Sequence, residues 1–363
     1  MRPAPRRVLL LCGGRSEEHD VSLASARSVL EAVAGSPSLE VSPLVIGRGG
    51  ATLSLSESAA RLGVTPARLE EAGHAANGDS ELSAPSPGRD GLTRSLAEAR
   101  SAYDVVFPLL HGPYGEDGSV QGLLKVMGVP FVGSDVLGSA VAMDKLAMKA
   151  VLAAAGLPQV EHRAVTRAGY RADPVATVAT LDELGKPVFV KPANLGSSIG
   201  VTRVDDGADM AAALESALTY DRRAIVEAAA VGARELAVAV LGNDAPLASG
   251  VGEIRYDAAG GAFYDFETKY TDGRADLLIP ADVPPEVAES ARRMALEAFA
   301  AVDAAGLARV DFFYLPDGAL LVNEINTIPG FTRHSMYPRL WQAAGVGYAE
   351  LVERLVELAL EPR

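Results

Sequence analysis

The sequence predicts an α/β protein that begins with an open, mostly parallel sheet and continues with α+β parts. Two alternations of strand and helix predict the parallel sheet. An apolar run at residues 8–12 precedes a helical pattern at residues 21–33, and a run at residues 103–110 precedes one at residues 118–127. A turn signal within residues 309–326 predicts antiparallel strands later in the chain.

Two further apolar runs, residues 41–46 and 129–132, complete the expected N-terminal sheet. Between them, residues 49–100 contain mainly Ser, Gly, Ala and scattered charge, which is typical of surface helices and a variable excursion. We expect this first domain to occupy residues 1–140.

The rest of the chain mixes helices and strands less regularly. The expected elements are, in order, residues 141–155 (helix), 187–191, 199–204, 224–227 and 235–241 (strands), and 285–304 and 348–360 (helices). A long excursion at residues 250–279 interrupts this series. We expect a central subdomain at residues 141–227 and a C-terminal domain at residues 228–363.

The turn signal near the C-terminus is the dipeptide at residues 317–318, Asp-Gly, which is typical of a two-residue hairpin. With that turn, Asp311 faces Glu324 and Arg309 faces Asn326. Because side chains alternate along a strand, all four lie on one side of the hairpin. The apolar side chains expected on the same side, nearer the turn, are Phe313, Leu315, Leu320 and Val322.

Two acids that face each other without a cation between them repel, and a divalent metal removes that cost. Carboxylate and amide oxygens suit Mg²⁺ or Mn²⁺. We therefore expect a metal site at Asp311, Glu324 and Asn326. The alternative is an exposed hairpin with incidental charges, because a slip of one residue in register scatters the set.

Composition restricts the class of partner. Lys and Arg number 33 against 47 Asp and Glu, a net charge of −14, which argues against nucleic acid or an anionic membrane surface. A nucleotide needs only a local basic pocket, so it remains compatible. The single cysteine, Cys12, suits a reducing compartment, and no apolar run reaches membrane-spanning length. We expect a cytoplasmic protein.

The run at residues 191–200, called here the Gly/Ser loop, lies between two expected strands. It lacks the order of a P-loop and the helix that follows one. Its Gly and Ser residues still let backbone N–H groups approach phosphate oxygens, and Lys191 stands at the end of the preceding strand. Lys145 could add a second positive charge. The alternative is an ordinary flexible loop.

Two more polar segments follow strand ends, the usual ligand side of an open α/β sheet. His111 begins the run HGPYGEDG and could orient a carboxylate or stabilise developing negative charge; a single structural hydrogen bond is the alternative. Glu18 follows the first strand and could hold an ammonium group. A dinucleotide site is not expected there, because G-x-G-x-x-G is missing.

Taken together, these segments resemble the D-alanine–D-alanine ligase family of the ATP-grasp superfamily. The resemblance extends from Gly13 to Pro338, and its most specific parts are residues 111–118 and 309–330. It implies an ATP-grasp fold behind the N-terminal domain. It also implies ATP-dependent joining of two D-alanines through a D-alanyl phosphate, for peptidoglycan precursor synthesis.

The resemblance implies roles in nucleotide binding. The residues that it places at ATP are Lys145, Lys191, Ser198, Glu227, Glu235 and Lys269. Asp311, Glu324 and Asn326 would hold two Mg²⁺ or Mn²⁺ ions, with Glu324 bridging them, and a monovalent cation stays an open addition. Residues 228–234 are richer in small side chains than is usual in the family.

It also implies roles around the two D-alanines. The residues that it places there are Glu18, His111, Ser197, Tyr270, Arg309, Gly330, Ser335 and Met336. Glu18 would anchor the ammonium of the first D-alanine, with His111 beside it. Tyr270 would bond to Glu18 and Ser197, so that residues 250–279 close as a lid. Arg309 and the Gly330 N–H would form an oxyanion hole. Ser335 and the Met336 N–H would hold the carboxylate of the second D-alanine.

Three alternatives stay open at this point. The first is a D-alanine–D-lactate ligase, against which Tyr270 argues. The second is another ATP-grasp carboxylate–amine ligase, and the third is a nucleotide-binding regulator without catalysis. The expected ligands are ATP and D-alanine, with neither nucleic acid nor a membrane as partner, and the resemblance implies a homodimer formed through the N-terminal domain.

Overall fold

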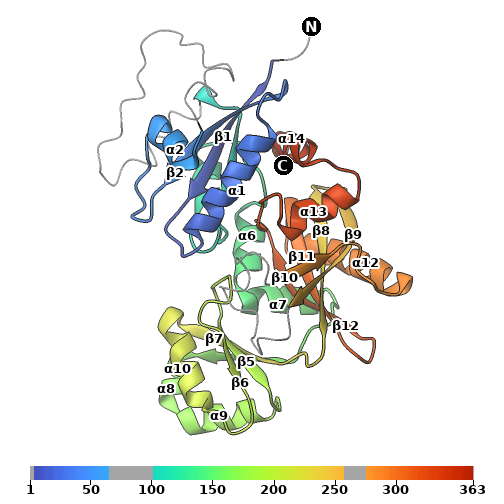
Figure 1. Cartoon of the computed structure of the whole chain (residues 1–363). Coiled ribbons are helices and arrows are strands. Elements are labelled where there is room, and N and C mark those ends of the chain that lie inside the picture. Colours follow the sequence, from blue (N-terminus) through green and yellow to red (C-terminus); the bar gives the residue numbers. More distant parts are fainter. Residues whose placement is uncertain (1–3, 65–100, 257–274, 363) are drawn as a thin grey trace.

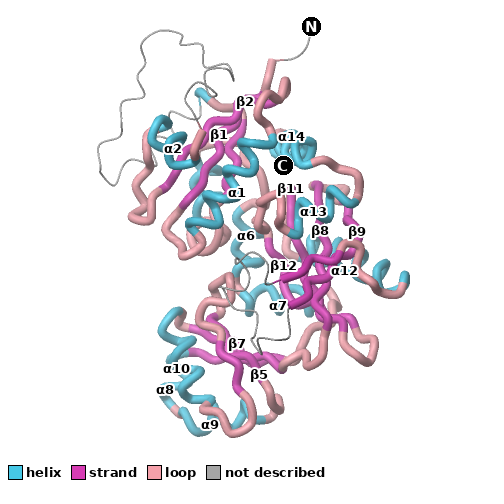
Figure 2. The backbone as a smooth tube through the Cα atoms, viewed as in Figure 1, coloured by secondary structure: helices cyan, strands magenta, loops and turns pink. Residues whose placement is uncertain are grey.

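The computed structural model describes residues 4–64, 101–256 and 275–362 (Figure 1). Its strands form three sheets with the orders β2-β1-β3, β4-β7-β5-β6 and β10-β9-β8-β11-β12. Figure 2 shows them as three separate groups of strands along the molecule. Lys269 and Tyr270 lie outside the described residues.

The first sheet is parallel, as the sequence predicts. Its strands are β1 (Arg6–Gly13), β2 (Leu39–Ile46) and β3 (Val105–Leu109), and its helices are α1 (His19–Ala32), α2 (Leu55–Leu62) and α5 (Ser119–Val126). Leu10 of β1 packs in the cluster that contains side chains of α1, and Leu9 packs in the cluster that contains those of α5. Both faces of β1 are therefore covered, which explains its uninterrupted apolar run.

Two expected elements of this region differ in the structure. Residues 129–132 contribute only an isolated bridge between Phe131 and Val106 instead of a strand. The helix expected at residues 141–155 is two helices, α6 (Val136–Met143) and α7 (Lys145–Ala154). They separate at Asp144, whose extended backbone lets its carboxylate accept from the Ala147 N–H at 3.0 Å. This N-cap starts a new helix and places Lys145 in its first turn.

The central sheet is antiparallel. Its strands are β4 (His162–Thr166), β7 (Arg223–Ala228), β5 (Val188–Pro192) and β6 (Thr202–Val204), and the helices of this part are α8 (Arg167–Ala172), α9 (Pro174–Asp182) and α10 (Met210–Tyr220). Val190 and Val226 pack with the apolar side of α10. Lys191 and Glu227 alternate with them and therefore occupy the opposite face of the sheet.

The third sheet is also antiparallel. Its strands are β8 (Arg234–Gly242), β9 (Leu247–Tyr256), β10 (Ala275–Leu278), β11 (Gly306–Tyr314) and β12 (Leu320–Asn326). Part of the excursion expected at residues 250–279 is thus paired strand, and the rest of the predicted lid lies outside the described residues. Helix α12 (Pro285–Ala301) packs against Val310 and Phe312 on one face of the sheet.

The opposite face of this sheet shares a core with the N-terminal sheet. Helices α13 (Met336–Ala343) and α14 (Tyr348–Ala359) contribute to that core, and Figure 1 shows α14 beside α1. Phe107 of β3 meets Phe331 edge to face, with ring centroids 5.7 Å apart. The segment after β12 is therefore fixed against the end of β3. The expected domain boundaries near residues 140 and 227 stay predictions.

The β11–β12 hairpin corrects the predicted turn. Leu315 and Ala319 flank a three-residue turn at residues 316–318, in which Gly318 has φ +91°. Pairing near the turn is therefore shifted by one residue, and a bulge between Asp311 and Phe312 shifts it back. The predicted apolar floor is wrong in part, because Val322 pairs with Phe312 and both are buried against α12 on the other face.

Candidate active site

Glu18 lies where three loops meet. It is the N-cap of α1 and is 5% exposed. The Ser197 hydroxyl, in the Gly/Ser loop, donates a hydrogen bond to its carboxylate. A Cβ atom added to Gly112 would lie 2.8 Å from Glu18 Oε2, and one added to Gly196 would lie 3.6 Å from it. The loops after β1 and β3 and the Gly/Ser loop thus converge on one carboxylate.

The Gly/Ser loop has an unusual backbone and is tied to α7. Ser197 and Ser198 have φ values of +50° and +58°, in the left-handed region that non-glycine residues rarely adopt. Such backbone costs roughly 1 kcal/mol or more per residue and is concentrated at ligand sites. Lys145 holds the loop from α7, because its ammonium donates to the Leu195 carbonyl and its N–H donates to the Ala193 carbonyl at 2.8 Å.

Glu227 lies between two lysines in the interior. The ammonium of Lys191, from β5, pairs with one of its carboxylate oxygens, and Nζ of Lys149, from α7, lies 2.9 Å from Oε1. The side chains of Lys149 and Glu227 are 1% and 4% exposed. Burial opposes the ionised carboxyl, but the two lysines hold the pKa of Glu227 well below its ordinary value.

Acids of the third sheet also act on Lys191. Glu235 lies near the start of β8, opposite Phe313 of β11. Burial disfavours the charged form of Lys191, but Glu227 first, and then Glu324 and Glu235, raise its pKa above its ordinary value. The structure therefore brings together these predicted ATP residues from two different sheets.

The polar face of the hairpin has the predicted register. Asp311 pairs with Glu324, and Arg309 pairs with Asn326. Arg309 Nε and Nη2 donate to the two oxygens of Asp311 at 2.7 and 2.6 Å. Asp311 thus has a cation on its own face of the hairpin. The resemblance places this cation, Arg309, at the oxyanion hole.

The donor set fits a divalent metal that also binds a polyanion. Two carboxylates and an amide supply three protein ligands of two types, and Asn326 Oδ1 accepts from the Ile328 N–H at 2.9 Å. The described ranges contain no group of three or more His, Cys, Asp or Glu placed to hold a metal ion. The oxygens of Asp311, Glu324 and Asn326 are of the kind that Mg²⁺ or Mn²⁺ prefers, and phosphate oxygens and water would complete the coordination of such an ion.

His111 makes structural hydrogen bonds across the interface between the first and third sheets. Its Nδ1 lies 3.1 Å from the Ile328 carbonyl, which can only accept, so Nδ1 carries the proton. Its Nε2 lies 3.5 Å from Ser25 Oγ, and that oxygen accepts from the Phe331 N–H at 3.3 Å. Burial lowers the pKa of His111, and Glu18 offsets this only in part. The neutral imidazole thus fixes residues 328–331 beside the Glu18 loop.

Gly330, Ser335 and Met336 lie together at the start of α13. Ser335 is the N-cap of this helix, and Met336 is its first residue. Ser335 Oγ accepts from the Thr332 N–H at 3.1 Å, and a Cβ added to Gly330 would lie 3.3 Å from it. A helix N-terminus presents free N–H groups that suit a carboxylate.

Two family models match successive parts of the chain. Residues 7–134 match "D-ala D-ala ligase N-terminus", and residues 151–357 match "D-ala D-ala ligase C-terminus". The chain belongs to the D-alanine–D-alanine ligase family. The resemblance inferred from the motifs is confirmed, and so are the α/β class and the ATP-grasp fold.

Individual relatives agree with this assignment. This ligase is 52% identical over 360 residues to the D-alanine–D-alanine ligase of Deinococcus radiodurans, covering 99% of each chain. The solved structure of the D-alanine–D-alanine ligase from Coxiella burnetii is 32% identical, with a TM-score of 0.77 and coverage of 98% of this chain and 94% of that one. The VanG D-Ala:D-Ser ligase from Enterococcus faecalis is 30% identical, with a TM-score of 0.76 and coverage of 98% and 100%.

Family membership makes the chain an ATP-dependent ligase, with ATP and D-alanine as its ligands. It therefore excludes the nucleotide-binding regulator without catalysis that the sequence left open. No helix among the described residues has the length and apolar content needed to cross a membrane.

Two buried residues beside the candidate site were not predicted from the sequence. Glu116 accepts from the Gly112 N–H at 2.6 Å, and burial, followed by the charge of Glu18, raises its pKa well above its ordinary value. Glu116 belongs to the run HGPYGEDG, which predicted a site at this loop but did not predict that the Glu116 side chain is buried. Lys149 stands four residues after Lys145 on α7, so helical spacing was the signal that could have found it.

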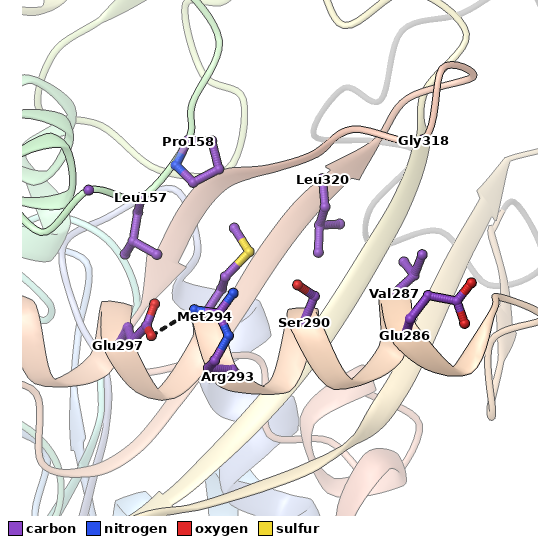
Figure 3. A pocket seen from close by; sticks show the side chains of 11 residues that line it. Leu157, Pro158, Glu286, Val287, Ser290, Arg293, Met294, Glu297, Gly318 and Leu320 are labelled. Atoms are coloured by element: carbon purple, nitrogen blue, oxygen red, sulfur yellow. Dashed lines mark hydrogen bonds and ion pairs between the residues drawn. The ribbon is translucent and has the colours of Figure 1, made fainter.

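A separate pocket of about 490 Å³ lies between α12 and the tip of the β11–β12 hairpin (Figure 3). Leu157, Met294 and Leu320 line it, and the Arg293–Glu297 ion pair of 2.8 Å lies at its edge. None of the predicted site residues that the structure describes lines it, so the pocket lies apart from those residues.

Proposed function

We propose that this ligase joins two D-alanines through a D-alanyl phosphate, for peptidoglycan precursor synthesis. The observation that carries the proposal is the polar face of the hairpin, where Asp311 faces Glu324 and Arg309 lies on the same side. A face of this kind can hold a metal–nucleotide complex and place a cation beside it.

The chemistry follows from the poor reactivity of a free carboxylate. An oxygen of the first D-alanine's carboxylate attacks the γ-phosphorus, the bond to the β-phosphate oxygen breaks, and ADP leaves. The amine of the second D-alanine, having lost a proton, attacks the acyl carbon. The tetrahedral intermediate collapses to the dipeptide and phosphate. The first step gives the acyl carbon a good leaving group, phosphate, and the second step expels that phosphate as the peptide bond forms.

The nucleotide would lie between the central and third sheets. Lys145 and Lys191 would contact the α- and β-phosphates, Ser198 would contact phosphate, and Lys269 would reach the γ-phosphate. Glu227 and Glu235 would bind adenine and ribose. The ion pair between Lys191 and Glu227, and the charges of Glu324 and Glu235 that also raise the pKa of Lys191, support this placement.

Asp311, Glu324 and Asn326 would hold two Mg²⁺ or Mn²⁺ ions, with Glu324 bridging them. When bound, these ions supply charge neutralisation between the β- and γ-phosphates. The Arg309 guanidinium would then release the Asp311 carboxylate and donate its hydrogen bonds to the substrate instead. A monovalent cation stays an open addition to these ions.

The two D-alanines would bind where the loops converge. Glu18 would anchor the first ammonium, with Ser197 and Tyr270 bonded to it and His111 adjacent. Arg309 and the Gly330 N–H would stabilise the oxyanion of the tetrahedral intermediate. Ser335 and the Met336 N–H would bind the second carboxylate. The Ser197–Glu18 hydrogen bond and the contact between Gly330 and Ser335 support this arrangement.

The cellular setting is proposed on the same basis. The ligase would act in the cytoplasm as a homodimer paired through residues 1–140. Residues 141–227 and 228–363 would form the central and C-terminal parts of the ATP-grasp fold. The acidic net charge of −14 supports a small-molecule substrate over nucleic acid.

Product analysis tests the proposal. The enzyme is incubated with ATP, Mg²⁺ and D-alanine, L-alanine, D-serine or D-lactate plus D-alanine between pH 6 and 9. We expect D-alanyl-D-alanine as the dominant product, with one ADP and one phosphate per dipeptide. A dominant depsipeptide would favour the D-alanine–D-lactate alternative, and a product without D-alanine would favour another carboxylate–amine ligase.

A further inference from the structure

Lys149 is a buried cation to which the proposed chemistry gives no function. It lies on α7 one turn after Lys145, and its side chain is 1% exposed. Burying an ammonium group is costly unless it is paired. Within the described part of the chain, Glu227 is the one acid within ion-pair distance of its Nζ, at 2.9 Å.

The other lysine at Glu227 has a different environment. Lys191 pairs with Glu227 but also experiences the charges of Glu324 and Glu235, and its side chain is 15% exposed. It lies at the edge of the interior, at the end of β5 where the Gly/Ser loop begins. Lys149 thus pairs with Glu227 alone among the described acids, while Lys191 also interacts with the charges of Glu324 and Glu235.

This difference matters once a phosphate enters. In the structure the Lys191 ammonium forms an ion pair with the Glu227 carboxylate. An ammonium that turns toward a phosphate gives up at least part of its contact with the carboxylate. A buried carboxylate that loses its only counterion is strongly destabilised. With Lys149 in place, Glu227 keeps one cation throughout.

We propose that Lys149 is a positioning residue for ATP: it neutralises Glu227 while the nucleotide phosphates draw Lys191 away. The inference rests on the proposed function, in which Lys191 contacts phosphate and Glu227 contacts adenine. Lys149 touches neither ligand and acts through Glu227. Its contribution is therefore specific to ligands that carry phosphate.

The test compares two ligands in one binding assay. Adenosine occupies the adenine pocket without recruiting Lys191, whereas Mg²⁺–ATP recruits it. In Lys149→Met, we expect the Kd of ATP to rise by a factor of about 10 or more, and that of adenosine, measured by competition, to change less than about threefold. In turnover, the KM for ATP rises and kcat changes little. Lys125→Met is the matched control, because it removes a lysine from an exposed ion pair with Asp135.

A double variant separates this effect from a loss of folding. Lys149→Met/Glu227→Gln removes one buried cation and one buried anion together, so it keeps the interior balanced. In the Glu227→Gln background, Lys149→Met should change the Kd of ATP less than about threefold. The proposal is overturned if Lys149→Met weakens adenosine and ATP equally, or weakens ATP equally in both backgrounds. A wild-type chain that binds no ATP would instead refute the proposed function.

Discussion

Asp311 lies directly opposite Glu324 in the β11–β12 pair, although the turn that joins the two strands is one residue longer than expected. The bulge between Asp311 and Phe312 restores the register at the polar end. It also places Arg309 on the same face, where its guanidinium binds both oxygens of Asp311. Asp311, a proposed metal ligand, and Arg309, the cation proposed for the attacked carbonyl, are thus in contact in this structure.

The Arg309→Ala variant should separate nucleotide binding from chemistry. Removing an oxyanion donor typically costs a factor of about 100 to 1,000 in kcat. Because the proposed metal ions would take over the neutralisation of Asp311, the Kd of Mg²⁺–ATP should change less than about threefold. Phosphate release and equilibrium binding measure the two effects. Arg293→Ala on α12, whose ion pair is exposed, is the control that should leave both unchanged. Equal losses in binding and turnover would contradict the assignment.

Gly112 is expected to be required for the shape of the first D-alanine site. A Cβ there would lie 2.8 Å from Glu18 Oε2, and its φ of +73° favours glycine. Gly128→Ala is a matched control, with φ +65° and no atom within 4 Å of the added Cβ. The positive φ alone should lower the free energy of unfolding by about 1 kcal/mol in each variant, and Gly112→Ala should lower it further because its Cβ displaces the Glu18 carboxylate. Only Gly112→Ala should also raise the KM for D-alanine, and equal KM values in the two variants would refute the role of Glu18.

His111 should make the enzyme less stable in mild acid. Burial lowers its pKa in the folded chain below the ordinary value near 6.5. The unfolded chain therefore binds the proton first, so the contribution is complete above about pH 6.5 and is lost as pH falls toward the folded pKa. We expect the difference in unfolding free energy between wild type and His111→Gln to shrink by up to about 1.4 kcal/mol per pH unit there. Urea unfolding between pH 5 and 8 measures it, and a difference independent of pH would contradict a neutral His111.

Glu116→Gln should have the opposite dependence on pH. Burial and the charge of Glu18 raise the pKa of Glu116, so the folded chain favours its protonated form. The stabilising contribution is present below the ordinary carboxyl pKa and is lost as pH rises through the folded value. Glutamine can still accept from the Gly112 N–H and carries no charge. The variant should therefore gain stability relative to wild type from pH 5 to pH 8 in the same unfolding assay. A constant difference would show that Glu116 is ionised throughout.

The hairpin shows how far local sequence reasoning reaches. The Asp-Gly signal located the turn and the facing pairs at its polar end correctly. The pairs near the turn were wrong, because Pro316 extends the loop and a bulge compensates. Turn length and bulges depend on how the hairpin packs against α12, and the alternation of side chains along a strand does not predict that packing.

The burial of Lys149 and Glu116 could not be predicted from the sequence, for a different reason. Lys149 and Glu116 are charged residues in helical or loop segments, where charges usually face solvent. Their burial results from the meeting of α7 with the central sheet, and of the β3 loop with α1. Glu18 and Lys191 could be predicted as site residues because strand ends are a local feature of the sequence, and Arg309 because strand alternation places it on one face with Asp311.

The central claim is that the face with Asp311 and Glu324 holds the divalent ions. Counting bound Mn²⁺ by electron paramagnetic resonance, with a non-hydrolysable ATP analogue present, tests it most directly. Wild type should bind two Mn²⁺ per chain, and Glu324→Gln, which keeps the size of the side chain, should bind one or none. Undiminished binding of two ions in Glu324→Gln and in Asp311→Asn would contradict the account.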